Sequence, residues 1–97
     1  MKVRELLDSP EKWIQGEFAV DASGHPVSEI SPTACKWCLS GAVYHCYPSD
    51  PLCTEVRSKL KSHLSPGPNQ YVNLASWNDS PDTTWEMVKD LLDKADV

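Results

Sequence analysis

The sequence predicts a mainly helical α+β fold in one small domain that spans residues 1–97. Three segments carry apolar residues at helical spacing, and each follows a helix start signal. One short segment alternates before a glycine-containing turn, which is typical of a β-hairpin. A chain of 97 residues is long enough to bury one core and too short for two. We therefore expect three to four helices with a short hairpin on one side.

Four dipeptides place a side-chain oxygen acceptor before a proline, a combination that favours the first turn of a helix. They are Ser9-Pro10, Ser31-Pro32, Asp50-Pro51 and Ser80-Pro81. In the last case Thr83 and Glu86 also have capping-box spacing. Each dipeptide predicts a helix start.

The N-terminal half combines short helical turns with the predicted hairpin. Val3, Leu6 and Leu7 indicate a first helix, and residues 10–13 a second turn. Residues 18–27 predict the hairpin, with Phe18 and Val20 on one side of its first strand and residues 21–24 as its turn.

Three longer helices are predicted, over residues 32–46, 51–64 and 84–95. Residues 65–69 contain two prolines and a glycine and predict a loop. The apolar residues of segment 71–77 fit neither the helical nor the strand period, so the segment is ambiguous between a short strand and a helical turn.

The charge of the chain bears on its partners. Fourteen acidic and nine basic residues give a formal net charge of -5, and the basic residues are scattered. This disfavours binding to nucleic-acid phosphates. The first residues lack the apolar run of a signal peptide, and no stretch is long enough to span a membrane. We expect a cytoplasmic protein with reduced cysteines.

Residues 34–46 contain Cys35, Cys38 and Cys46, and a zinc site is their first chemical interpretation. Cys35 and Cys38 have the spacing of a zinc knuckle. Continuous helix would separate Cys38 from Cys46 by about 12 Å along its axis, too far for both to bind one metal ion. Cys53 or His63 would have to come from the next helix, which would leave Cys46 unexplained.

Two further interpretations use the thiols directly. Cys35 and Cys38 form a C-x-x-C sequence, but with Ser31 as the helix cap Cys35 lies beyond the first turn, and no strand is predicted to lead into the motif. A cysteine nucleophile with His45 or His63 as its base is a weak signal, because neither cysteine lies in a glycine-rich turn.

Packing explains the segment better than any of these chemistries. A narrow stripe of small apolar side chains recurs at helical spacing: Cys35, Cys38, Leu39, Ala42 and Cys46. Ser40, Gly41 and Ala42 add little bulk and would let another helix or a tryptophan ring approach closely. We therefore expect no catalytic residue, metal or cofactor here, and expect Cys38→Ala to be tolerated better than Cys38→Ser.

Trp77-Asn78-Asp79 admits two interpretations. In the structural one, Asn78 and Asp79 bond local backbone while Trp77 fills the core. In the functional one, Trp37 or Trp77 offers a stacking face beside the polar pair Asn78 and Asp79. The candidate binding residues are therefore Trp37, Trp77, Asn78 and Asp79.

Residues 34–42, ACKWCLSGA, followed by residues 77–84, WNDSPDTT, and Val88 resemble a family pattern, "WC-x-x-GA … WND-x-P-x-TT … V". The pattern is that of small bacterial and phage proteins known only as a domain of unknown function. Residues 13–16 and 21–27 fit it too. The resemblance implies a shared architecture and a bacterial or phage origin, and it implies no activity.

Two function hypotheses follow. The first is a non-catalytic interaction or accessory module that binds another protein, which small size, acidic charge and the lack of a catalytic signature favour. The alternative is a small thiol- or metal-dependent protein that uses Cys35 and Cys38.

Overall fold

The computed structural model of the chain describes residues 1–49, 51–64 and 74–97, and within them it is mainly helical. The helices are α1 (Val3–Leu6), α2 (Leu39–Cys46), α3 (Leu52–Ser62), α4 (Leu74–Asp79) and α5 (Trp85–Ala95). A 3-10 turn η1 (Pro10–Lys12) and the strands β1 (Ala19–Val20) and β2 (Lys36–Trp37) complete the elements. The predicted α+β class is confirmed.

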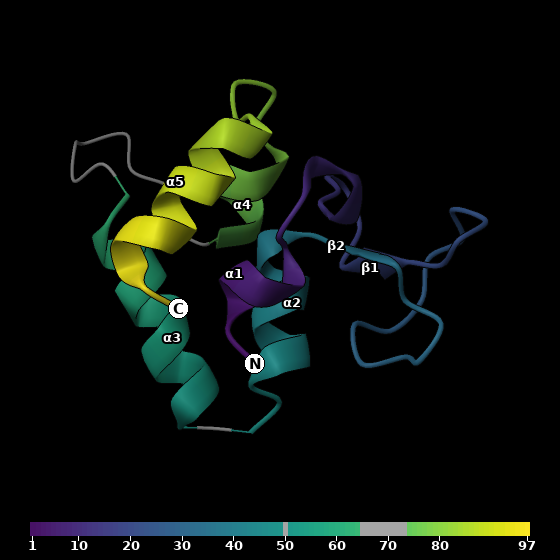
Figure 1. The fold of residues 1–97 in the computed structure, drawn as a ribbon, viewed down its shortest axis with the longest axis horizontal. Helices are drawn as coiled ribbons and strands as arrows, with labels where there is room; N and C mark the ends of the chain where they lie inside the picture. Colours follow the sequence, from purple (N-terminus) through teal and green to yellow (C-terminus); the bar gives the residue numbers. More distant parts are fainter. Residues whose placement is uncertain (50, 65–73) are drawn as a thin grey trace.

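Helix α2 lies at the centre of the helical part, in contact with α1, α3 and α4, while α5 packs on α1 and α3 (Figure 1). Leucines from these helices are fully buried between them: Leu39, Leu60, Leu74 and Leu92. The predicted apolar face of α3 is confirmed, because Cys53, Val56 and Leu60 are buried. The two chain ends lie close together, joined by a 3.1 Å hydrogen bond from the Arg4 amide to the Val97 carbonyl.

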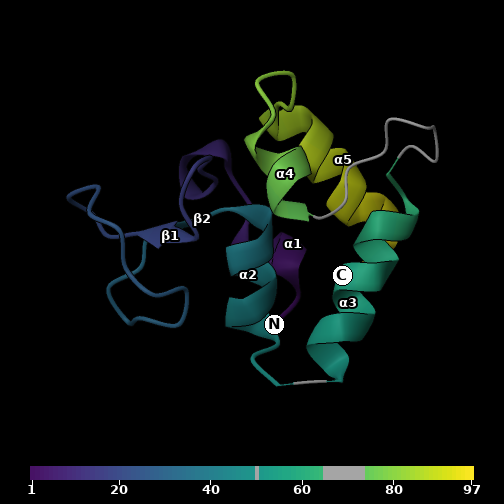
Figure 2. The same cartoon turned by 180° about the vertical axis from the view of Figure 1, so that it is seen from behind.

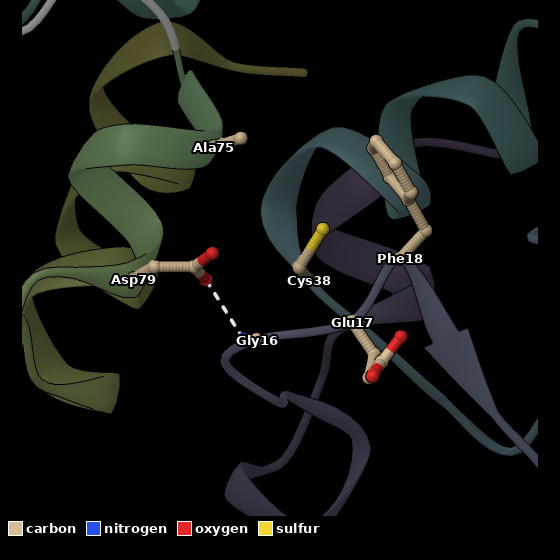
Figure 3. Close-up of a pocket in the computed structure, with 6 residues that line it drawn as sticks. All are labelled: Gly16, Glu17, Phe18, Cys38, Ala75 and Asp79. Carbon is tan, nitrogen blue, oxygen red and sulfur yellow. Dashed lines mark hydrogen bonds between the residues drawn. The ribbon is translucent and has the colours of Figure 1, made fainter. Parts of the chain in front are cut away.

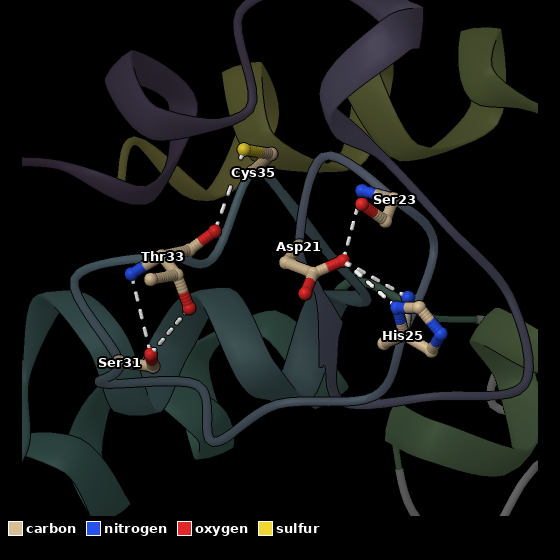
Figure 4. Close-up of polar contacts among 6 residues, drawn as sticks. All are labelled: Asp21, Ser23, His25, Ser31, Thr33 and Cys35. Carbon is tan, nitrogen blue, oxygen red and sulfur yellow. Dashed lines mark hydrogen bonds and ion pairs between the residues drawn. The ribbon is translucent and has the colours of Figure 1, made fainter.

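The strands lie to one side of the helices, and the loops between them extend away from the helical part (Figures 1 and 2). Strand β1 pairs antiparallel with β2, so that Ala19 faces Trp37 and Val20 faces Lys36. The predicted 18–27 hairpin forms only an isolated bridge between Val20 and Pro26. Its turn is stabilised by the Asp21 carboxylate, which accepts the amides of Ser23 and His25 (Figure 4). The regular partner of β1 thus comes from later in the chain.

The predicted helix start at Ser31-Pro32 is wrong. The Ser31 hydroxyl accepts the Thr33 amide in a local turn (Figure 4), and the Cys35 amide donates to the Val20 carbonyl at 2.8 Å. The backbone groups that a helix from residue 32 would use therefore bond the turn and the sheet, and α2 begins only at Leu39. Strand β2 occupies the two residues between Cys35 and Cys38, where the sequence predicts helix.

The C-terminal half follows the predictions more closely. Helices α3 and α5 occupy the predicted segments. The helix start predicted at Ser80-Pro81 is wrong, because Pro81 lies in a turn and α5 begins at Trp85 with Thr84, rather than Thr83, as its cap. The buried Thr83 hydroxyl instead donates to the Trp77 carbonyl at 2.6 Å. The ambiguous segment 71–77 is helical from Leu74 onward. Asp50 and the predicted loop 65–69 lie outside the described residues.

Candidate functional site

The fully buried Asn78 links three parts of the chain through its side chain. Its Oδ1 accepts hydrogen bonds from Trp13 Nε1 at 2.6 Å and from the Leu39 amide at 2.9 Å. Its Nδ2 donates to the Ile14 carbonyl at 3.1 Å. Because the Leu39 amide is one of the free donors at the start of α2, Asn78 caps that helix from α4.

Asp79 extends this linkage to the segment before β1. Its Oδ1 accepts from the Gly16 amide and from Asn78 Nδ2, both at 2.9 Å. The Gln15 side chain donates to the carbonyls of Asn78 and Ser80. Residues 13–16 are therefore held against the C-terminal end of α4, and Asn78 and Asp79 bond distant backbone as well as each other.

Trp37 and Trp77 are core residues, each 7% exposed. The Trp37 ring lies 5.1 Å from the His45 ring, centroid to centroid, and its Nε1 donates to the Glu29 carbonyl. His45 Nδ1 contacts the same carbonyl at 2.7 Å. The two tryptophans are therefore core residues and offer no exposed stacking face. Of the four candidate binding residues, only Asp79 is exposed.

An open groove of about 190 Å³ lies beside Asp79 and is lined by Gly16, Glu17, Phe18, Cys38, Ala75 and Asp79. We name it the Phe18 groove. Ala75 and Asp79 project from α4 on one side, Phe18 stands opposite, and Cys38 lies between them (Figure 3). The Phe18 side of the groove is open to solvent, because Phe18 is 51% exposed. Val20 is buried, whereas Phe18 is half exposed. The expectation that Phe18 and Val20 share one side of the strand is therefore wrong.

Gly41 accounts for the position of Phe18. A methyl group at Gly41 would overlap the Phe18 carbonyl oxygen, so only glycine allows the backbone before β1 to lie on the first turn of α2. The same carbonyl accepts the Cys38 amide at 3.2 Å. A close approach is confirmed at Gly41, but the approaching group is the backbone at Phe18 and not the expected helix or tryptophan ring.

Cys38 is the N-cap of α2, where its Sγ accepts the Gly41 amide at 3.2 Å. Burial raises the pKa of the Cys38 thiol, and the negative charge of Asp79 raises it further. The protonated thiol is therefore favoured, which is the opposite of what a reactive cysteine needs.

Cys35 does not belong to the predicted cysteine stripe. It precedes β2, is exposed, and its Sγ donates to the Thr33 carbonyl at 3.5 Å (Figure 4). Side chains three residues apart along an extended segment point to opposite faces, so Cys35 and Cys38 diverge. Farther along, burial raises the pKa of Cys46 to about 11.

Among the described residues, the lining of the Phe18 groove combines two carboxylates with apolar surface and contains neither a histidine nor a basic residue. Across residues 1–49, 51–64 and 74–97, no group of three or more His, Cys, Asp or Glu side chains could hold a metal ion. The sequence analysis missed Gly16, Glu17, Phe18 and Ala75 as groove residues. Of these four residues only Gly16 carried a signal, because it belongs to residues 13–16, which fit the family pattern.

The fold and the groove define a small α+β protein with an acidic and partly apolar surface site. The chain belongs to the Family of unknown function (DUF6197), whose model matches residues 1–96. No curated protein and no solved structure matches it. The prediction that the chain belongs to a family of unknown function is therefore confirmed. In the part of the chain that the structure describes, no helix is long and apolar enough to cross a membrane.

Proposed function

We propose that this chain is a non-catalytic protein-interaction module of bacterial or phage origin, and that the Phe18 groove is where it contacts its partner. The observation that carries the proposal is the half-exposed ring of Phe18 on a backbone held close to α2 by Gly41. Aromatic side chains on a rigid surface are typical anchors of protein interfaces. A cytoplasmic location is supported by the four free cysteines, which suit a reducing compartment.

The rigidity of the groove supports the same proposal. Gly16 is fixed by Asp79, and Asp79 follows the fully buried Asn78. A site whose walls are already ordered loses little conformational entropy on binding. In this proposal Asp79 contacts the partner directly, whereas Asn78, Trp77 and Trp37 hold the site in shape from within.

The chemistry of the groove favours binding over catalysis. A cysteine nucleophile needs a lowered pKa or a neighbouring base. Burial raises the pKa of Cys38, and the groove lining offers no histidine. The divergence of Cys35 and Cys38 likewise disfavours the alternative of a dithiol or metal-dependent protein.

Quantitative affinity capture from an extract of the source organism tests this proposal. The bait would be the wild-type protein, Phe18→Ala and the control Met87→Ala, which removes a side chain that is 42% exposed on α5 and outside the groove. We expect at least one protein to be captured by wild type and by Met87→Ala, and to be reduced about tenfold or more by Phe18→Ala. Circular dichroism would verify that all three baits are folded.

Capture that is the same with all three baits would refute the groove as the interface. Turnover of a substrate by the purified protein would refute the non-catalytic assignment.

A further inference from the structure

We infer that the Phe18 groove receives a basic side chain, Arg or Lys, from the partner protein. This inference rests on the proposed function and adds the chemistry of the occupant. It is carried by the carboxylate of Asp79, the ring of Phe18 and the size of the groove.

The Asp79 carboxylate has one oxygen available to a partner. The hydrogen bonds that it accepts from described residues, from the Gly16 amide and Asn78 Nδ2, both end on Oδ1. The other oxygen points toward the space between Ala75 and Cys38 (Figure 3). Among the described residues, no ion pair includes Asp79 or Glu17. In the described part of the chain, the negative charge of the groove is therefore not neutralised by an ion pair.

The apolar lining suits the rest of an Arg or Lys side chain. Such side chains bury an aliphatic stem while the cationic end stays in a polar or aromatic environment. The Ala75 methyl group and the Phe18 ring offer surface for the stem, and the face of a Phe ring also attracts a cation. A cation between Phe18 and Asp79 would thus interact with both.

The volume of the groove limits the size of the occupant. At about 190 Å³ it is smaller than the roughly 300–1,000 Å³ of small-molecule pockets, and so it suits one side chain. An acidic side chain would be repelled by Asp79, and an apolar one would cover that carboxylate without pairing it. With a net charge of -5, the whole protein also attracts a basic partner.

Two peptides that differ only in charge test this inference. The first is acetyl-Gly-Ala-Arg-Ala-Gly-amide, and in the second citrulline replaces arginine, which keeps the shape and removes the charge. Titration into the ¹⁵N-labelled protein would be followed by amide shifts in two-dimensional NMR. We expect the arginine peptide to shift the amides of Gly16, Phe18 and Cys38 with millimolar affinity, and the citrulline peptide to bind about three- to fivefold more weakly.

The variant Asp79→Asn isolates the charge, because asparagine retains the oxygen that accepts from the Gly16 amide. We expect it to lose the preference for arginine over citrulline. Asp82→Asn removes the same charge at an exposed position outside the groove and should retain that preference.

Equal binding of the two peptides, or a preference that survives Asp79→Asn, would overturn the inference. So would the absence of shifts at the groove up to about 20 mM peptide. In these cases the proposed function would still stand if capture of the partner depends on Phe18. If capture does not depend on Phe18, the proposed function itself fails and the inference fails with it.

Discussion

Replacing Gly41 by alanine tests the close contact that shapes the groove. In an open helix this change would raise stability by about 1 kcal/mol. Here the new methyl group would overlap the Phe18 carbonyl oxygen and lie 2.9 Å from its carbonyl carbon. The neighbour is backbone and cannot turn aside as a flexible side chain would. Relief requires β1 or α2 to move, which strains the hydrogen bond from the Cys38 amide to Phe18.

The two opposing effects set the expected magnitude. Overpacking a filled site costs about 1–3 kcal/mol, and contact with backbone places Gly41→Ala at the upper end. Subtracting the helical gain of about 1 kcal/mol leaves a net loss of about 2 kcal/mol. In a domain of this size that loss lowers the melting temperature by about 8–16 °C.

Urea unfolding followed by tryptophan fluorescence would measure the loss, since the chain has four tryptophans. Ser58→Ala, at an exposed position of α3, is the control and should change stability by no more than about 0.5 kcal/mol. If Gly41→Ala is as stable as wild type or more stable, the backbone at Phe18 does not lie against α2 and the description of the groove is wrong.

Four further predictions concern Asn78 and the cysteines. Asn78→Ala should cost about 3 kcal/mol or more in urea unfolding, because Trp13 Nε1 and two backbone groups would lose their buried partner; a loss below about 1 kcal/mol would contradict these bonds. Cys38→Ser should be more stable than Cys38→Ala by about 1 kcal/mol, because serine can still cap α2, and the reverse order would favour the packing interpretation instead. Alkylation of the native protein with iodoacetamide, mapped by mass spectrometry, should modify the exposed Cys35 first. The alkylation rate of Cys46 should rise about tenfold per pH unit until near its pKa of about 11, because only the thiolate reacts; a plateau below about pH 9.5 would contradict that shift.

The order of stability predicted for the two Cys38 variants is the reverse of the one expected from the sequence. A cysteine within a helix would behave as a small apolar side chain, for which alanine is the milder replacement. At the N-cap its sulfur accepts a backbone amide, and serine is among the residues preferred at that position. The same residue therefore has a different role because the helix begins seven residues later than predicted.

Much of the fold could be predicted because its signals are local. The apolar spacing of α3 and α5 is contained within each segment, and Ser9-Pro10 begins η1 as predicted. The small side chains at residues 40–42 also indicated a close approach to α2, which the structure shows at Gly41, although the approaching group is backbone. These features depend on residues within one or two turns of each other, so spacing along the chain is sufficient to find them.

The candidate site depends on contacts between distant residues. Asn78 caps Leu39 across 39 positions, and Asp79 bonds Gly16 across 63. The start of α2 is also decided at a distance, because pairing with β1 draws Cys35 and Cys38 into extended backbone despite the helix signal at Ser31-Pro32. Local patterns are sufficient to predict the fold class, the apolar faces of α3 and α5 and a close approach at Gly41. The start of α2 and the position of Phe18 opposite Asp79 depend on contacts between distant segments, and hydrogen bonds between such segments leave no periodic pattern in a sequence.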